Sequence, residues 1–158
     1  LQSQLPPIQV LSLDPEHQLR TSVASALKGL AQSEPDATRG LAFFEETERR
    51  VRAAGHDLPL ELLDDWRAAA EGYGKAAQAD EVARRVIDRA DRAIPGIFDQ
   101  DDREKARKYR NRARASMARR RLESGDREGA RALYEAAQAA GDLEHEGRRP
   151  WAWVPEGL

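Results

Sequence analysis

Apolar residues recur every three or four positions along most of this chain, and Pro or Gly interrupts the pattern at intervals. This spacing places apolar side chains on one face of an α-helix, whereas a half-buried strand would alternate apolar and polar residues. Apolar residues make up 40% of the 158 residues; much of this fraction is alanine, which favours closely packed helices. We therefore predict an all-α fold without a central strand.

Capping and helix-breaking residues divide this pattern into six helices joined by short turns. Asp favours the N-cap and Pro the first turn, whereas Gly or Pro ends a helix. The first helix is expected over residues 15–31 after an Asp14 cap, the second from near Pro35–Asp36 to Gly55, and the third after Pro59. The fourth is expected to start at an Asp80 cap and to end at Pro95–Gly96. The fifth is expected to start at Asp99–Asp102, and the sixth after a Gly125–Asp126 turn.

Six helices with short turns pair naturally as three antiparallel α-hairpins. We expect these hairpins to form a single domain over residues 15–142. An extended lead-in, residues 1–14, precedes the domain, because two adjacent prolines prevent a helix there. The tail, residues 143–158, is expected to be irregular, and it carries Trp151 and Trp153.

The second half of the chain carries residues at the spacing of a known helical repeat. The matching residues are Trp66, Ala69, Ala70 and Tyr73 for the motif W-x2-L-G-x2-Y, then Ala83 and Ile87 followed by Pro95, and in the last hairpin Ala130, Tyr134 and Ala137. Residues 60–142 therefore resemble tetratricopeptide (TPR) helical repeats in a degenerate form.

The resemblance implies a right-handed stack of hairpins whose first helices line a concave surface. Such a surface binds peptides or partner proteins and has no chemistry of its own. The chain departs from the repeat in several places, and the fifth helix lacks the leading Trp. Ala83 and Ala130 are 47 residues apart, whereas the repeat is about 34 residues long, and Asp142 stands where a repeat-ending Pro is usual. A plain bundle of α-hairpins is the alternative.

No constellation of residues indicates catalysis or metal binding. The chain has no cysteine, and none of His17, His56 and His145 has a second ligand at a metal-binding spacing. The acidic run Asp99–Asp102 lacks the Gly and Glu of a calcium loop and is better explained as a helix N-cap. Phosphate-binding Gly loops and nucleophile motifs are not found. We predict a non-enzymatic protein without a cofactor or metal.

Positive charge is concentrated in residues 103–121, which hold ten Lys or Arg residues and one acidic residue, Glu104. The whole chain has a net charge of −2, so the remaining residues hold 16 basic and 27 acidic groups. Such a segmental imbalance bears on the choice of partner rather than on the fold.

On a helix these cations form two stripes on either side of an apolar seam. The first stripe is Arg103, Arg107, Arg110, Arg114 and Arg121, the second is Lys105, Lys108, Arg112 and Arg119, and the seam is Ala106, Tyr109, Ala113 and Met117.

Three interpretations of the basic helix remain open. Its charges meet the acidic surface of the neighbouring helices or of a second copy of the chain. Alternatively, its guanidinium groups bind the carboxylates of an acidic protein or peptide. In the third interpretation they bind the phosphates of a nucleic acid, or another anionic surface.

We predict a protein–protein interaction module, acting as a scaffold or adaptor, whose Arg-rich helix docks an acidic partner segment. The residues expected to contact the partner are Arg103, Arg107, Tyr109, Arg110, Arg114 and Arg121. Trp151 and Trp153 either pack the tail on the domain or bind a partner.

The remaining features bound the origin of the chain only loosely. No apolar run approaches the length of a membrane span. The chain begins at Leu1 without a Met, so we expect a fragment or a processed form. Heavy use of Ala and Arg indicates a bacterial protein. The sequence identifies neither the partner nor the compartment nor the oligomeric state.

Overall fold

The computed structural model describes residues 35–144, 147–154 and 158, and within them the protein is all helical, without a strand. This confirms the all-α prediction. The α-helices are α3 (Ala37–Ala53), α4 (Leu60–Gly72), α5 (Ala76–Ala93), α6 (Gln100–Glu123) and α7 (Arg127–Ala139), and the short 3-10 turns are η2 (Ile94–Gly96) and η3 (Arg149–Trp151). The expected lead-in, residues 1–14, and the expected first helix, residues 15–31, lie outside the described residues.

Aspartate side chains cap three of these helices where the sequence predicts a start. The carboxylates of Asp36, Asp99 and Asp126 each accept a bond of 2.8 Å from a backbone N–H in the first turn of α3, α6 and α7. These bonds satisfy donors that have no partner inside the helix. Gly125, at a φ of 87°, makes the turn between α6 and α7 that the sequence predicts before Asp126.

The fourth predicted helix begins earlier than expected. α5 starts at Ala76, and its N-cap Lys75 makes no side-chain capping bond, so the prediction of an Asp80 cap is wrong. The alanine-rich residues 76–79 are strong helix formers, and they extend the helix by a turn ahead of the aspartate. The Asp80 carboxylate instead accepts a hydrogen bond of 2.6 Å from Arg120 Nε on α6.

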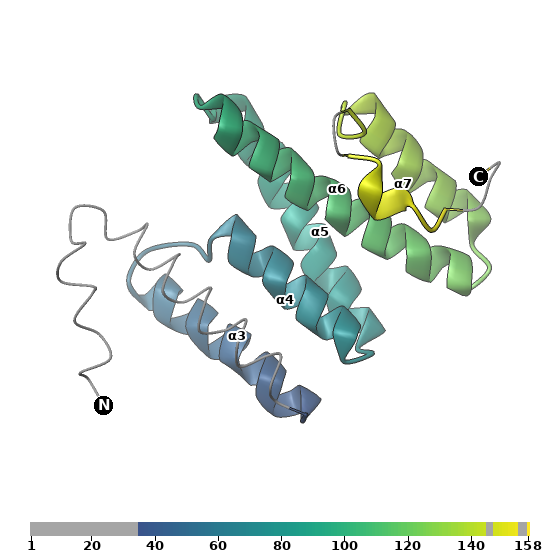
Figure 1. The fold of residues 1–158 in the computed structure, drawn as a ribbon. Coiled ribbons are helices and arrows are strands. Elements are labelled where there is room, and N and C mark those ends of the chain that lie inside the picture. Colours follow the sequence, from purple (N-terminus) through teal and green to yellow (C-terminus); the bar gives the residue numbers. More distant parts are fainter. Residues whose placement is uncertain (1–34, 145–146, 155–157) are drawn as a thin grey trace.

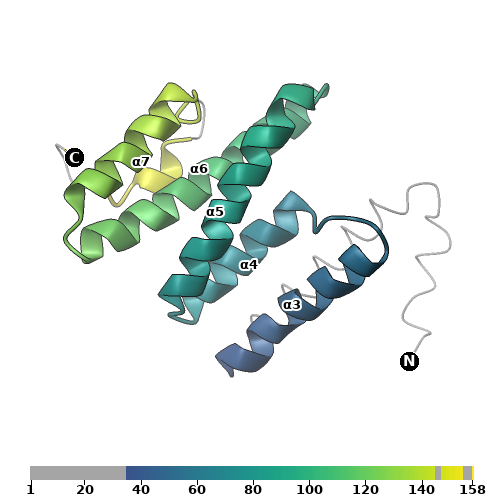
Figure 2. The same ribbon diagram turned by 180° about the vertical axis from the view of Figure 1, so that it is seen from behind.

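Consecutive helices pack against one another, and α4 also contacts α6. Figures 1 and 2 show α3 to α7 following one another side by side, with the segment 147–154 lying against α6 and α7. Turns of three residues join α4 to α5 and α6 to α7, which correspond to the second and third predicted hairpins. The first helices of these two hairpins, α4 and α6, are therefore neighbours.

The core has two parts of different composition. The part around α3, α4 and α5 contains large side chains, among them Phe44 and Trp66, whose rings stack with centroids 5.9 Å apart. Between α6 and α7 the buried residues are mostly alanine, and Trp151 from the tail completes them. The Trp151 ring meets Tyr134 edge to face at 5.2 Å, and its Nε1 donates to Asn111 Oδ1 at 2.8 Å. Of the two alternatives for Trp151, the structure shows the one in which it packs the tail on the domain.

Replacing Trp151 with Ala should lower the free energy of unfolding by about 3 kcal/mol, because alanines around it leave nothing to refill the space. Urea unfolding followed by circular dichroism measures the loss. The matched control is Glu135→Ala, since the Glu135 side chain is exposed on α7 and contributes little burial. Equal stability of Trp151→Ala and the control would show that the tail is not part of the core.

Candidate functional site

The basic segment forms one continuous helix, α6, of 24 residues. Asp99 caps it, Asp101 and Asp102 lie in its first turn, and Arg120 and Arg121 lie in its last turn. Acidic groups near the N-terminus and basic groups near the C-terminus interact favourably with the helix dipole. The charges at both ends therefore stabilise the helix itself.

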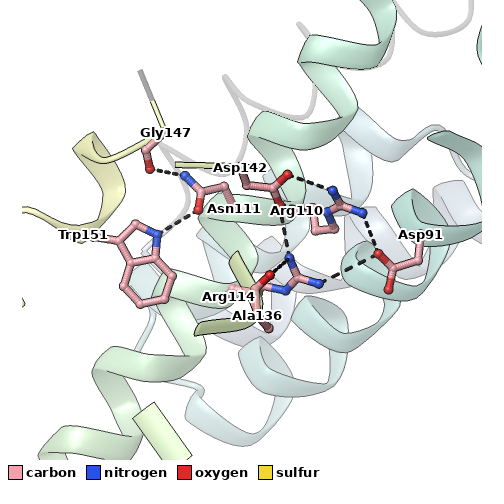
Figure 3. A network of polar contacts seen from close by, with 8 residues as sticks. All are labelled: Asp91, Arg110, Asn111, Arg114, Ala136, Asp142, Gly147 and Trp151. Atoms are coloured by element: carbon pink, nitrogen blue, oxygen red, sulfur yellow. Dashed lines mark hydrogen bonds and ion pairs between the residues drawn. The ribbon is translucent and has the colours of Figure 1, made fainter. Parts of the chain in front are cut away.

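Two arginines of the first stripe point into the protein and bind internal carboxylates. Arg110 donates to both oxygens of Asp142, each at 2.8 Å, and its Nη1 donates to Asp91 Oδ1 at 2.7 Å. Arg114 Nη1 donates to Asp142 Oδ2 at 3.2 Å, and the Asp142 side chain is fully buried. Figure 3 shows both guanidinium groups converging on Asp142, while Asn111 points away from them toward Trp151.

The network shifts the pKa values of the two arginines in opposite directions. Burial lowers the pKa of Arg110, but hydrogen bonds to Asp142 and Asp91 outweigh burial, so its pKa is raised. Burial also lowers the pKa of Arg114, the neighbouring Arg110 charge lowers it further, and the net shift is downward despite Asp142. Because a guanidinium stays protonated at any physiological pH, both groups remain charged and need their counter-ions.

The position of Asp142 explains a departure from the repeat pattern noted in the sequence. Gly141, at a φ of 76°, turns the chain after α7, and the backbone N–H of Asp142 donates to Ala137 O at 3.0 Å. This turn directs the carboxylate back onto α6. An aspartate at the usual place of a repeat-ending Pro is thus the counter-ion of the buried arginines.

Arg120, in the last turn of α6, is also paired with carboxylates of neighbouring helices. Arg120 donates to Asp80 on α5 at 2.6 Å and to Glu71 on α4 at 3.0 Å. Ser116 donates to the same Glu71 oxygen at 3.0 Å. Part of the positive charge therefore meets acidic groups of adjacent helices, as one of the three interpretations states.

Five of the remaining cations of α6 line a groove on its outer side. One cavity of about 400 Å³ lies between the first half of α6 and the segment 141–150, and an adjoining cavity of about 230 Å³ continues between α6, α4 and the tail. We call the two cavities the basic groove, and its basic residues on α6 and the tail are Lys105, Arg107, Lys108, Arg112, Arg119 and Arg149. Four of the six, Lys105, Lys108, Arg112 and Arg119, are the second stripe.

Most of these groove cations have no counter-ion within the described part of the chain. No ion pair or hydrogen bond there engages the side chains of Lys105, Arg107, Lys108 and Arg149, and the Nε of Arg107 is buried without an acceptor. Arg112, in contrast, forms a long ion pair with Asp64, with 3.8 Å between Nη1 and Oδ2. The groove therefore presents positive charge that the described residues leave uncompensated.

The structure distributes the predicted arginine contacts among three environments. Arg110 and Arg114 are buried in internal ion pairs, so we no longer assign them to a partner. Arg103 donates to Gln100 at 2.8 Å in the first turn of α6, and Arg121 lies 3.4 Å from Asp126 at the other end. Of the five predicted arginines only Arg107 lines the groove.

The predicted aromatic contacts are also partly enclosed. Tyr109 is half-buried against the core around α4, and burial, followed by the nearby carboxylates of Glu61 and Asp64, raises its pKa to about 12. Trp153 is half-buried; it stacks on Trp151 at 6.1 Å, and the Arg119 guanidinium lies 5.6 Å from its ring centroid. Trp153 lines the groove, whereas Tyr109 does not.

Comparison with other proteins adds nothing to this geometry. No family model, curated protein or solved structure matches this chain. The resemblance to TPR repeats therefore stays a prediction from residue spacing. Among the described residues no three His, Asp or Glu side chains are grouped to hold a metal ion, and no described helix combines the length and hydropathy of a bilayer span.

Replacing Asp142 with Ala should lower the free energy of unfolding by about 3 kcal/mol or more, because it leaves two buried guanidinium groups without their shared carboxylate. The matched control is Asp88→Ala, whose exposed pair with Arg92 contributes little. Chemical denaturation of both variants measures the difference.

A second variant tests the cause of that loss. In Arg110→Met/Arg114→Met/Asp142→Leu the charges are removed together, and much of the stability should return. If the triple variant is no more stable than Asp142→Ala, the loss comes from packing rather than from unpaired charge.

Proposed function

We propose that the protein is a non-enzymatic protein–protein interaction module whose basic groove binds an acidic segment of a partner. The observation that carries this proposal is the convergence of Lys105, Arg107, Lys108 and Arg149 on one cavity of about 400 Å³ without counter-ions in the described part of the chain. Guanidinium groups bind carboxylates in two-pronged geometry, and ammonium groups add point charge.

The acidic residues that also line the groove do not cancel this charge. Asp142 and Glu71 are engaged by arginines that face the interior or the far end of α6. Glu104 and Glu144 also line the larger cavity, against six cations on α6 and the tail around the two cavities. The field in the groove therefore favours an anionic ligand, and the partly enclosed walls strengthen it.

The length of the groove favours an extended peptide. From Lys105 to Arg119 the helix rises by about 21 Å, which matches about six residues of an extended chain. Pro150 and the half-buried Trp153 give the groove an apolar wall beside its cations. We therefore expect a short acidic segment that also carries an apolar residue.

The walls of the groove agree with what the TPR resemblance implies. Arg67 and Glu71 come from α4, and Arg112 and Ser116 come from α6, so the first helices of two hairpins line the same surface. This is the face on which such repeats bind peptides.

A nucleic acid would use the same cations through its phosphates, and this is the alternative. Sequence-independent binding to single strands also needs aromatic faces for stacking. Trp153 is the aromatic residue in the described groove, and its ring already contacts Arg119 and Trp151. The acidic peptide is therefore the preferred ligand.

The variant Lys105→Glu/Lys108→Glu/Arg149→Glu should weaken binding of a fluorescein-labelled Glu- and Asp-rich octapeptide containing one Leu by roughly tenfold or more. Fluorescence anisotropy measures the affinity. The matched control is Arg84→Glu/Arg127→Glu/Arg131→Glu, which changes net charge equally at exposed residues away from the groove.

Three outcomes decide the proposal. Loss of binding in the groove variant alone supports it. An equal loss in the control variant, or no binding by the wild type, overturns it. A labelled oligonucleotide that binds the wild type more tightly than the peptide, with an affinity that falls steeply with salt, would favour the nucleic-acid alternative.

A further inference from the structure

The start of α6 presents an exposed aromatic ring and free carboxylates beside the basic groove. Phe98, just before the N-cap Asp99, has a fully exposed side chain. Asp101 in the first turn is also exposed. A single exposed apolar side chain is common on protein surfaces, so it is the charges beside Phe98 that indicate a partner.

The charges on this face of α6 change sign along the helix. At about 100° per residue, five side chains fall within an arc of about 100°: these are Asp101, Glu104, Lys105, Lys108 and Arg112. The two acidic residues occupy the N-terminal half of the stripe and the three basic residues the C-terminal half. The stripe is therefore complementary to itself when it is reversed.

The side chains of this stripe are available for contact. Asp101, Lys105 and Lys108 are exposed, and no ion pair or hydrogen bond engages their side chains in the described part of the chain. Glu104 accepts a bond of 3.2 Å from Gln100, one turn away in an exposed position. Arg112 is partly exposed, 3.8 Å from Asp64.

We infer that a second copy of this chain docks on this face, with the two α6 helices antiparallel about a two-fold axis between Glu104 and Lys105. Asp101 then meets Lys108 of the second copy, and Glu104 meets Lys105 of the second copy, so each pair forms twice. A parallel arrangement would place like charges opposite each other, which excludes it. A two-fold axis also closes the assembly at two copies.

The same arrangement covers the exposed Phe98 ring. Counting along the reversed helix, Phe98 lies opposite Asn111 and Arg112 of the second copy, at the wall of the larger cavity. There the ring would be covered by Pro150 and by the aliphatic stems of the groove cations, which pack against apolar surface while their heads stay in water. In the dimer, the exposed ring of one copy thus packs against the partly apolar cavity of the other.

This inference rests on the proposed function, because the acidic segment in the groove is supplied by the second copy. It adds a regulatory consequence. An external acidic segment and the second copy compete for the same cations, so the groove is open in the monomer and closed in the dimer. Partner binding should therefore weaken as the concentration of the protein rises.

Sedimentation velocity from low micromolar to near-millimolar protein tests the inference. At low salt the wild type should form a dimer whose dissociation constant rises with salt. Lys105→Glu/Lys108→Glu and Asp101→Lys/Glu104→Lys should each weaken the dimer roughly tenfold or more. The combined four-residue variant reverses both signs and should restore it. Phe98→Ala should weaken the dimer without affecting the folded monomer.

The outcomes separate this inference from the proposed function. Peptide anisotropy is measured at protein concentrations below dimerisation, where Asp101→Lys/Glu104→Lys should keep its affinity for the acidic octapeptide. A protein that binds the peptide but stays monomeric at every concentration overturns the dimer alone. Dimers without peptide binding overturn the proposed function alone. Failure of the four-residue variant to restore association, or growth beyond two copies, overturns the two-fold arrangement.

Discussion

The arrangement of α6 depends on one buried carboxylate. Asp142 accepts bonds from Arg110 and Arg114, and Asp91, their other counter-ion, has a side chain that is 48% exposed. Two desolvated guanidinium groups without this partner would drive the helix to rotate toward water. The carboxylate therefore fixes the rotation of α6 about its own axis. That rotation determines which cations form internal ion pairs and which line the groove.

That rotation is the property that the sequence does not determine. The positions of the helices follow from local chemistry: Asp36, Asp99 and Asp126 cap helices where the sequence predicts them, and the short turns predict the pairing of α4 with α5 and of α6 with α7. On α6, however, basic and apolar residues surround most of the helix, so the helical period defines two stripes without showing which one faces a neighbour. The prediction places the first stripe at the binding surface because arginine is expected there, whereas Arg110 and Arg114 of that stripe form internal ion pairs.

Partners that are distant in the sequence account for the remaining differences between the predictions and the structure. Nothing local to Asp142 indicates that it binds residues 28 and 32 positions earlier. Asp80 was assigned to a helix start because aspartate favours that position; its partner, Arg120, lies 40 residues away. Charged residues can satisfy local and distant roles equally well, and only the packed structure decides between them.

The small residues between α6 and α7 bear on the order in which the domain is completed during synthesis. Ala115, Ala118, Ala130 and Ala137 bring the two helices close but bury little area themselves, and the large ring that they enclose comes from Trp151. An α6–α7 hairpin that has emerged from the ribosome before residue 151 lacks its main apolar contribution. The hairpin should therefore remain open to chaperones and proteases until the tail follows, so the last described segment acts as the closing step of folding rather than as an appendage.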